Sequence, residues 1–352
     1  MLYSLLKPIL FQLDPEIAHN LAIFLLKHNL VPISKNIKYQ SLSNVIWGIH
    51  FDNPIGMAAG FDKNAMVFDK LFNFGFGFVE VGTVTAKPQF GNPKPRMFRL
   101  KEDEAIINRL GFNNLGIDNL LKNIGKNSQT NQIIGINIGK NKDALDAIQD
   151  YQFLLQKSYG QSDYITINIS SPNTKNLRDI QKADELDLFL NAIVAEKKIL
   201  QKTINQNIPI LLKIAPDLSK QEQEAIVDIS LRQNIDGLII GNTTVSRPQY
   251  LQNKYKTEIG GLSGKPLLGI SNAVLANIGQ LTKGRIPIIA TGGISSAQDI
   301  YQKIKFGASL VQIYSAFIYQ GFSLVEKVKK ELNLLLEKDG FKNIGEAIGK
   351  GL

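Results

Sequence analysis

Short apolar segments alternate with longer segments of helical periodicity along most of this chain. From residue 54 onward, eight segments rich in Val, Ile and Leu are separated by stretches with apolar residues at helical spacing. Strands that are buried on both faces form continuous apolar runs, and helical connections between them indicate parallel βαβ units. Eight such units predict an α/β fold, a closed (β/α)8 TIM barrel, with a doubly wound open sheet as the alternative. The predicted strands are 54–58, 77–81, 133–138, 164–169, 209–214, 237–240, 287–290 and 310–313.

An N-terminal amphipathic helical hairpin is predicted before the first of these strands. Apolar residues follow helical spacing over 2–10 and again over 17–25. Asp14 can cap the second helix, and Pro15 suits its first turn, where a missing N–H costs little. We therefore predict two domains, a helical segment over 1–40 and a barrel over 41–352. The hairpin either packs on the barrel or also lies in a membrane interface.

Two connections between predicted strands are longer than an ordinary βα loop. Residues 83–111 and 242–270 each follow a strand, on the side of a barrel where active sites are built. We expect both to form lids or walls of a site.

Composition narrows the chemistry that the chain can support. The 352 residues include no cysteine and only three histidines. Disulfides, thiolate metal sites and a cysteine nucleophile are therefore excluded, and we predict no metal site.

The net charge of +9 would attract nucleic acids, anionic membranes and anionic small molecules alike. No run approaches the roughly 20 apolar residues of a transmembrane helix. The N-terminus also makes a poor signal peptide, because Lys7 and Asp14 break its apolar run and no small-residue cleavage site follows.

Polar residues end the predicted strand 164–169. The segment 167–174 reads Ile-Asn-Ile-Ser-Ser-Pro-Asn-Thr, and all three histidines lie upstream of it. If proton transfer takes place here, Ser171 is a serious candidate for the base.

Other strand ends predict a flat, anionic ligand. Lys213 interrupts an apolar strand, so its ammonium either meets negative charge or extends to the barrel rim. Amides follow several strands, at Asn137, Asn168, Asn173 and Asn242, and amides can bind the edge of a planar polar ligand. Small residues at 56–60 would let such a ligand approach closely. The glycines at 292–293 and the residues at 314–315 follow strands seven and eight, where barrels commonly bind phosphate.

Taken together, these residues resemble the quinone-linked class 2 dihydroorotate dehydrogenases over nearly the whole chain. The residues that carry the resemblance are Gly60-Phe61-Asp62-Lys63, Glu80-Val81-Gly82-Thr83-Val84-Thr85, Asn108-Arg109-Leu110-Gly111-Phe112-Asn113-Asn114, Asn137-Ile138-Gly139-Lys140-Asn141, the Ser171 segment, Lys213-Ile214-Ala215-Pro216-Asp217, Gly261-Leu262-Ser263-Gly264 and Gln312-Ile313-Tyr314-Ser315.

The resemblance implies an FMN enzyme of pyrimidine (UMP) biosynthesis that oxidises dihydroorotate to orotate. The FMN-binding residues that it implies are Ala59, Gly60, Phe61, Asp62, Lys63, Thr83, Asn137, Asn168, Lys213, Gly241, Gly264, Gly293, Tyr314 and Ser315. The substrate-binding residues are Lys63, Asn108, Arg109, Leu110, Gly111, Phe112, Asn168, Asn173, Asn242 and Thr243. Gly241 departs from the family, which usually has Thr or Ser there, so only a backbone contact to FMN is expected at this position.

By the same resemblance, Ser171 removes a proton from C5 of dihydroorotate while hydride passes from C6 to the flavin. A serine is intrinsically a poor base, so the site must orient it and stabilise the charge that develops on the substrate. Soluble class 1 relatives use cysteine at this position, and this chain has none.

The resemblance also implies that the helical hairpin leads a membrane quinone, ubiquinone or menaquinone, to the flavin. His19 and Arg99 would line the quinone site. The expected location is peripheral, on the cytoplasmic side of a bacterial cell membrane, and no nucleic-acid partner is expected.

Two alternatives remain at this point. A flavin-barrel tRNA dihydrouridine synthase would use the positive charge, but that family relies on a cysteine acid, which is absent here. A non-catalytic barrel that serves as a binding module is disfavoured because polar residues gather at the strand ends of one face.

Overall fold

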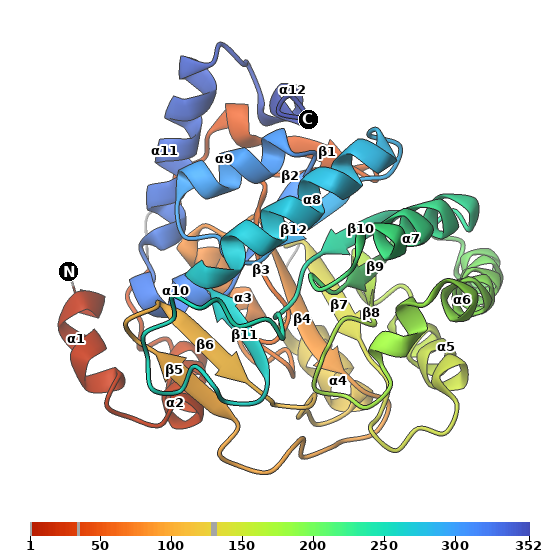
Figure 1. The fold of residues 1–352 in the computed structure, drawn as a ribbon, viewed down its shortest axis with the longest axis horizontal. Helices are drawn as coiled ribbons and strands as arrows, with labels where there is room; N and C mark the ends of the chain where they lie inside the picture. The colour runs from red at the N-terminus through yellow and green to blue at the C-terminus, as the bar shows by residue number, and fades with distance from the viewer. Residues whose placement is uncertain (1, 34–35, 128–131) are drawn as a thin grey trace.

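Eight parallel strands close into a barrel, which confirms the predicted TIM-barrel fold and makes the open-sheet alternative wrong (Figure 1). The computed structural model describes residues 2–33, 36–127 and 132–352. In spatial order the strands are β3 (Ile55–Met57), β4 (Phe78–Val84), β7 (Ile134–Ile138), β8 (Tyr164–Asn168), β9 (Ile210–Ile214), β10 (Gly237–Ile240), β12 (Ile288–Thr291) and β13 (Leu310–Ile313), which pairs with β3. Each predicted strand overlaps one of these.

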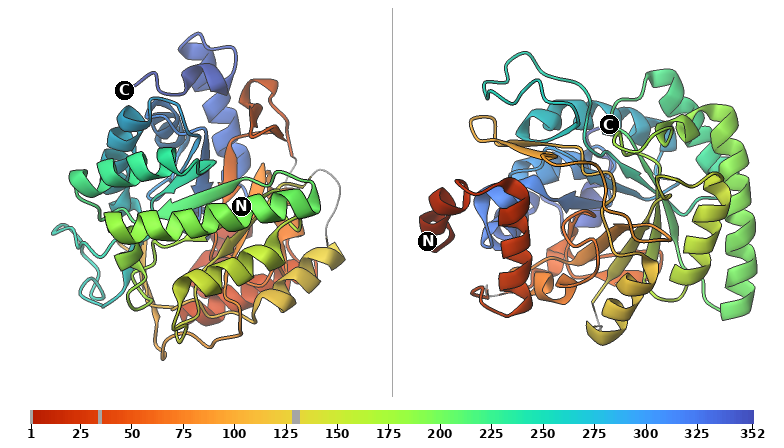
Figure 2. Two further views of the ribbon diagram at one scale, coloured as in Figure 1. Left: turned by 90° about the vertical axis from the view of Figure 1, so that its right-hand side faces the viewer. Right: turned by 90° about the horizontal axis from the view of Figure 1, so that it is seen from below.

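Helices surround the barrel on its outside, as two further views show (Figure 2). They are α3 (Phe68–Leu71), α4 (Ile117–Asn127), α5 (Ala147–Ser158), α6 (Ala183–Ile204), α7 (Lys220–Arg232), α8 (Leu268–Thr282), α9 (Ala297–Lys305), α10 (Ser315–Gln320), α11 (Leu324–Lys338) and α12 (Ile344–Ala347). Local capping fixes several of their ends. Ser219 and Ser296, for example, each form a capping box at the start of α7 and α9.

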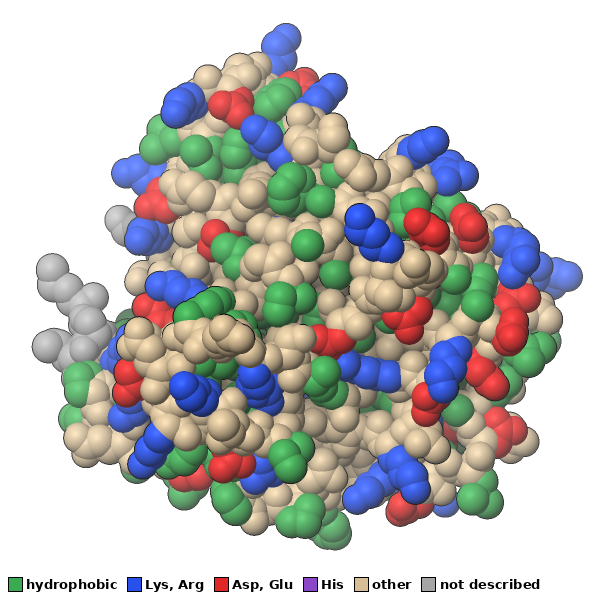
Figure 3. Space-filling view, in the orientation of Figure 1, with side chains coloured by type: hydrophobic (Ala, Val, Ile, Leu, Met, Phe, Trp, Pro, Cys, Tyr) green, Lys and Arg blue, Asp and Glu red, His purple; other side chains and the backbone are tan. Residues whose placement is uncertain are grey.

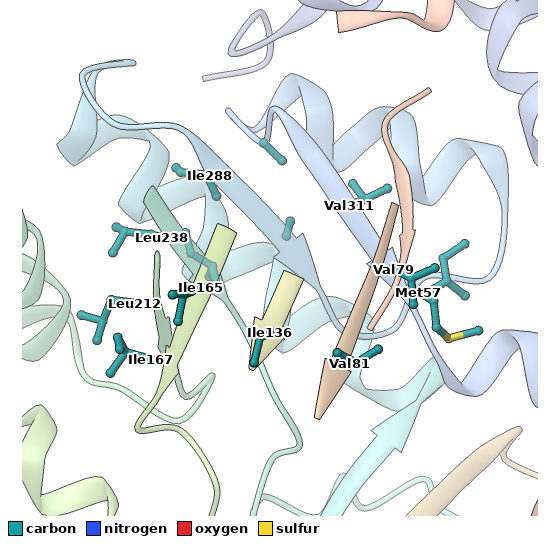
Figure 4. Close-up of a cluster of buried hydrophobic side chains, with 14 of the residues drawn as sticks. Met57, Val79, Val81, Ile136, Ile165, Ile167, Leu212, Leu238, Ile288 and Val311 are labelled. Carbon is teal, nitrogen blue, oxygen red and sulfur yellow. The ribbon is translucent and has the colours of Figure 1, made fainter. Parts of the chain in front are cut away.

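The strands are apolar throughout because both of their faces are buried. Alternate side chains such as Val79, Ile136 and Leu212 belong to the main core, together with residues of the surrounding helices (Figure 4). The residues between them face the barrel interior. This arrangement explains why the strands read as continuous apolar runs instead of alternating ones.

The barrel interior has an apolar lower layer and a polar upper layer. Phe78, Tyr164, Leu211, Ile239 and neighbouring side chains form the lower layer. A short hairpin of β1 (Asn44–Ile46) and β2 (Ile49–Phe51) packs against this layer. Two residues further along the strands, the interior positions become Glu80, Thr166, Lys213, Gly241 and Gln312. The polar layer therefore lies directly beneath the carboxyl ends of the strands.

The predicted helical hairpin is present as α1 (Leu2–Leu10) and α2 (Pro15–Lys27). Asp14 caps α2 as predicted, since its carboxylate accepts the N–H groups of Glu16 and Ile17. An ion pair of 2.6 Å between Glu16 and Arg96 fastens the hairpin to the barrel domain. The hairpin lies beside the loops at one side of the barrel (Figures 1 and 2).

The two long connections pair with each other in a separate antiparallel sheet. β5 (Met97–Leu100) and β6 (Ala105–Asn108) come from the first connection, and β11 (Gly261–Gly264) comes from the second. The order is β11-β6-β5, and α2 packs against β5. The expected site walls are therefore one continuous structure between the barrel mouth and the helical hairpin.

Candidate active site

A cleft of about 1160 Å³ opens at the carboxyl ends of the barrel strands. Most of the side chains predicted to bind cofactor or substrate line it, which places residues from nearly every strand end in one site. These are Ala59, Gly60, Lys63, Thr83, Asn108, Leu110, Gly111, Phe112, Asn168, Ser171, Asn173, Lys213, Asn242, Thr243, Gly264, Gly293, Tyr314 and Ser315.

Asn137, in contrast, lies one layer below the cleft. Its side chain is fully buried, and its Oδ1 accepts hydrogen bonds from Thr83 Oγ1 at 2.6 Å and from Asn168 Nδ2 at 3.0 Å. Thr83 and Asn168 both line the cleft, so Asn137 supports two residues that can touch a ligand.

Phe61 and Asp62 were also predicted to bind the cofactor, but neither lines the cleft. The carboxylate of Asp62 accepts the N–H groups of Met66 and Val67 and thereby holds the loop after β3. Burial raises the pKa of Asp62. The ring of Phe61 points to a second cavity, described below, and packs edge-on against His19 at 5.4 Å between ring centres.

Arg109 and Gly241, which were also predicted to bind substrate and cofactor, do not line the cleft. The Arg109 guanidinium does not line the cleft but pairs with Glu258 at 2.8 Å and stacks over Phe98. Gly241 has φ of +109°, and a Cβ there would lie 2.5 Å from the carbonyl oxygen of Thr291. A side-chain contact from position 241 is therefore sterically excluded in this backbone.

A charged group that we did not anticipate sits under the cleft. The Lys213 ammonium lies 3.7 Å from the carboxylate of Glu80, and both side chains are almost fully buried. The Glu80 carboxylate therefore supplies negative charge next to Lys213, as we predicted for this buried ammonium. Glu80 could have been recognised by the same signal as Lys213, a charge inside an apolar strand.

The loop after β8 presents Ser171 to the cleft. The Ser171 hydroxyl accepts the N–H of Asn173 at 3.2 Å, and Asn173 Nδ2 donates to the carbonyl of Asn108 at 3.2 Å. Ser170, the neighbouring residue, donates from its hydroxyl to Asn168 Oδ1 at 2.7 Å and accepts from Asn242 Nδ2 at 2.7 Å. These contacts fix the loop from both sides.

Lys63 provides a second cation at the cleft. Its ammonium donates to the carbonyl of Gly60 at 2.9 Å. Burial lowers the pKa of Lys63 to about 8, although the negative charge of Glu16 counteracts the shift. The group is therefore charged at neutral pH, and a bound anion would keep it charged to higher pH.

A second cavity of about 1460 Å³ lies between the helical hairpin and the barrel. It is lined mostly by apolar side chains of both helices, such as Leu6, Leu10, Ala22 and Leu25, and by the two predicted quinone-site residues, His19 and Arg99. Burial, together with the nearby charge of Lys63, lowers the pKa of His19 to about 3. His19 is therefore neutral under ordinary conditions.

The two cavities share a wall. Met97, Ile106 and Tyr314 line both of them. Met97 and Ile106 come from β5 and β6, so the sheet built from the long connections supplies much of this wall.

Two further features bear on metal binding and on surface charge. Within residues 2–33, 36–127 and 132–352, no group of three or more His, Asp or Glu side chains is arranged to hold a metal ion. On the face drawn in Figure 3, basic and acidic side chains are interspersed.

Comparisons with known proteins point to one family. The family model described as "Dihydroorotate dehydrogenase" matches residues 41–336. A protein from Xanthobacter autotrophicus named "Dihydroorotate dehydrogenase (quinone)" is 46% identical over 351 residues, which cover 99% of this chain and 98% of the relative. A protein of the same name from Bartonella tribocorum is 49% identical over 95% of this chain and 92% of its own length.

A solved structure agrees with these sequence matches. The crystal structure of DHODH in complex with ferulenol from Eimeria tenella superposes with a TM-score of 0.92 and 40% identity. The match covers 96% of this chain and 95% of that one.

Proposed function

The chain belongs to the quinone-dependent dihydroorotate dehydrogenases, and on this premise we propose how its two cavities carry out the reaction. The protein oxidises dihydroorotate to orotate in pyrimidine biosynthesis and passes the electrons to a quinone. We propose that FMN and dihydroorotate occupy the cleft at the barrel mouth and that the quinone enters the apolar cavity. The observation that carries this proposal is the shared wall, which brings a polar site and an apolar site together across Met97, Ile106 and Tyr314.

The family uses a flavin, and the residues of the cleft fit FMN. Gln312 Oε1 is buried without a hydrogen-bond partner among the described residues, and Gln312 lines the cleft. An N–H at the edge of a flavin ring would satisfy this acceptor. Thr83, Asn168 and Lys213 add donors and acceptors on the same floor. Gly264, Gly293 and Ser315 would hold the phosphate at the other end, since close backbone approach is possible there.

When bound, the flavin would supply the acceptor for the hydride that leaves C6 of dihydroorotate and the carrier of those two electrons to the quinone. The remaining work falls to this chain's own residues. Ser171 removes the proton from C5, and Asn173 holds the Ser171 oxygen in place through its backbone N–H. Lys63 neutralises the substrate's negative charge, and Asn108, Asn168, Asn173, Asn242 and Thr243 hold the substrate ring.

His19 and Arg99 suit the head group of a quinone, an uncharged ring with two carbonyl oxygens. Arg99 Nε is buried and has no hydrogen-bond partner among the described residues, so it can donate to a carbonyl oxygen. His19 remains neutral because of its depressed pKa and adds no further charge to an apolar cavity.

We propose that the segment 1–40 is a distinct membrane-associating domain attached to the barrel of residues 41–352. The hairpin carries exposed apolar side chains at Ile9, Ile17, Phe24 and Leu30. No described helix has the length and apolar character that crossing a bilayer requires. Peripheral binding through these side chains, on the cytoplasmic side of the membrane, would give a membrane quinone access to the second cavity.

The proposal is tested by following the colour of the purified protein. Dihydroorotate should bleach the bound flavin without oxygen, and a ubiquinone analogue should restore the colour, whereas NAD and fumarate should not. Efficient reoxidation by NAD or fumarate would contradict the proposed electron route. A protein that neither carries FMN nor takes it up would contradict the proposed cofactor.

A further inference from the structure

The most deeply buried charge in the described barrel interior belongs to Glu80. Its side chain is fully buried, and it does not line the cleft. Oε1 accepts a hydrogen bond from Asn137 Nδ2 at 2.7 Å and lies 3.7 Å from Lys213 Nζ. Oε2 accepts hydrogen bonds from three further donors, namely Gln312 Nε2 at 2.8 Å, Thr166 Oγ1 at 3.1 Å and Tyr164 OH at 3.2 Å.

We propose that Glu80 is a positioning residue that sets the reduction potential of the bound flavin, by balancing the charge of Lys213 and by orienting the side chains of the cleft floor. This inference rests on the proposed function, because it takes the flavin to lie on that floor. Nothing in the chemistry of the reaction requires a carboxylate one layer below the cofactor, so its presence calls for a separate explanation.

The first part of the argument concerns charge. A buried carboxylate and a buried ammonium are each destabilising when unpaired, and here Glu80 and Lys213 are partners of each other. With both present, the net charge under the flavin is close to zero. If Lys213 were alone, its positive charge would favour the reduced cofactor, which carries more negative charge than the oxidised form. Glu80 therefore holds the reduction potential below the value that Lys213 alone would produce.

The second part concerns the direction of hydrogen bonds. An ionised carboxylate only accepts, so Asn137 must turn its NH2 group to Glu80 and its Oδ1 upward. That oxygen accepts from Asn168 Nδ2 at 3.0 Å, which turns Asn168 Oδ1 toward the Ser170 hydroxyl at 2.7 Å. The Ser170 oxygen in turn accepts from Asn242 Nδ2 at 2.7 Å.

In this series each side chain donates a hydrogen bond to the side chain below it, so each acceptor fixes the orientation of the next donor. The series runs from the centre of the barrel to Asn242 at the rim of the cleft. A single acceptor at its base thus decides which amide atoms are available to ligands in the cleft. Glu80 orients Gln312 in the same way. Gln312 Nε2 donates to Glu80, and Gln312 Oε1, which has no hydrogen-bond partner among the described residues, is left to accept from a ligand.

The test is a double-mutant cycle read out as the midpoint potential of the bound flavin, measured by equilibration with reference dyes on protein that has been loaded with FMN and freed of unbound FMN. Glu80→Gln should raise the potential, and Lys213→Gln should lower it. The double variant should lie close to the wild type because it removes both charges. We expect each single change to alter the equilibrium constant at least tenfold, which is about 30 mV for a two-electron couple.

Thr166→Val is the matched control. It removes one hydrogen bond to Glu80 and keeps both charges, and Thr166 does not line the cleft. The flavin potential of this variant should stay within about 30 mV of the wild type, which corresponds to less than a tenfold change in the equilibrium constant. A shift as large as that of Glu80→Gln would mean that any disturbance of the barrel centre has this effect, and would overturn the inference.

The cycle remains decisive if Glu80→Gln alone does not fold, because removing both partners of a buried pair is tolerated better than removing one. In that case the double variant must have a higher potential than Lys213→Gln, and equal potentials overturn the inference. An unchanged or lowered potential for Glu80→Gln also overturns it. If the wild type fails to bind FMN, the proposed function fails instead, so the two failures are distinguishable.

Discussion

Arg178 and Asp217 form a 2.7 Å ion pair that joins three loops of the cleft. Nε of Arg178 donates to the carbonyl of Ser170 at 2.8 Å, and Nη2 donates to the carbonyl of Thr243 at 3.0 Å. One guanidinium therefore fixes the residue before Ser171 and Thr243, a proposed substrate-binding residue at the rim. Asp217, from the loop after β9, holds the guanidinium in this orientation.

Loss of this ion pair should slow the reaction without removing the flavin. We expect Arg178→Met to reduce the rate of flavin reduction by dihydroorotate about 10- to 100-fold, because small misplacements of reacting groups are costly. Arg178→Lys should not rescue the rate, since a lysine cannot reproduce the planar set of contacts. Stopped-flow absorbance at the flavin band provides the measurement.

Arg232→Met is a suitable control, because Arg232 forms a comparable 2.8 Å pair with Asp187 on the surface. Its rate should equal that of the wild type. An Arg178→Met protein with a wild-type rate would show that the three loops are held by other means.

The Ser171 hydroxyl should be required for substrate oxidation but not for flavin binding. We expect Ser171→Ala to retain its yellow colour and to be reduced by dihydroorotate about 10²- to 10⁴-fold more slowly, the usual range for the loss of a proton-transfer group. Ser230→Ala is the control, since Ser230 also carries a buried hydroxyl, but on α7. Equal reduction rates in the two variants would remove Ser171 from its proposed role.

Orotate binding should weaken in alkaline solution because Lys63 loses its charge. The pKa of Lys63 is lowered to about 8, so the ammonium is present below that pH and lost above it. Above pH 8 the dissociation constant of orotate should rise toward tenfold per pH unit. Titration of the flavin spectrum with orotate between about pH 6.5 and pH 9.5 would reveal this slope.

Lys63→Arg serves as the comparison for this titration. A guanidinium stays charged over the whole range, so the variant should bind more weakly but with little pH dependence. A dissociation constant that does not change for the wild type would contradict the assignment.

Lys303 should make the stability of the protein depend on pH. Its ammonium is fully buried and donates to Ser271 Oγ and Asn272 Oδ1, both at 2.8 Å. Burial lowers its pKa from 10.5 to about 7. Between these two values the unfolded chain binds more protons than the folded one, so stability rises with pH.

The free energy of unfolding in urea, measured at about pH 7, 8 and 9, should therefore rise more for the wild type than for Lys303→Met. Lys350→Met, which removes an exposed lysine, controls for the change in net charge. Parallel pH dependences for the wild type and Lys303→Met would contradict the prediction.

The sequence was sufficient to predict the barrel, the hairpin and most of the cleft, because these depend on local patterns. Apolar runs mark the strands, and Asp14-Pro15 marks the start of α2. Residues at the carboxyl ends of parallel strands must meet at one end of a barrel, so their clustering also follows from the pattern. The quinone-linked class was confirmed by the comparisons, whereas the roles of individual site residues stay predictions.

Contacts between distant segments could not be predicted. Nothing local relates Glu80 to Lys213, or β6 to β11, since both pairings depend on how strands far apart in sequence are brought together. Arg109 shows a second limit. Its neighbours Asn108 and Leu110 line the cleft, and because side chains alternate along an extended segment, Arg109 points the other way, to Glu258.

The wall between the two cavities also limits how this protein can acquire resistance to inhibitors. Met97 and Ile106 each present one side chain to both cavities. A substitution there that excludes a compound from the apolar cavity also reshapes the cleft that we propose for FMN and dihydroorotate. Substitutions on the helical hairpin, at positions such as Ala22 or Leu25, should in contrast change the apolar cavity alone, because these residues line only that cavity.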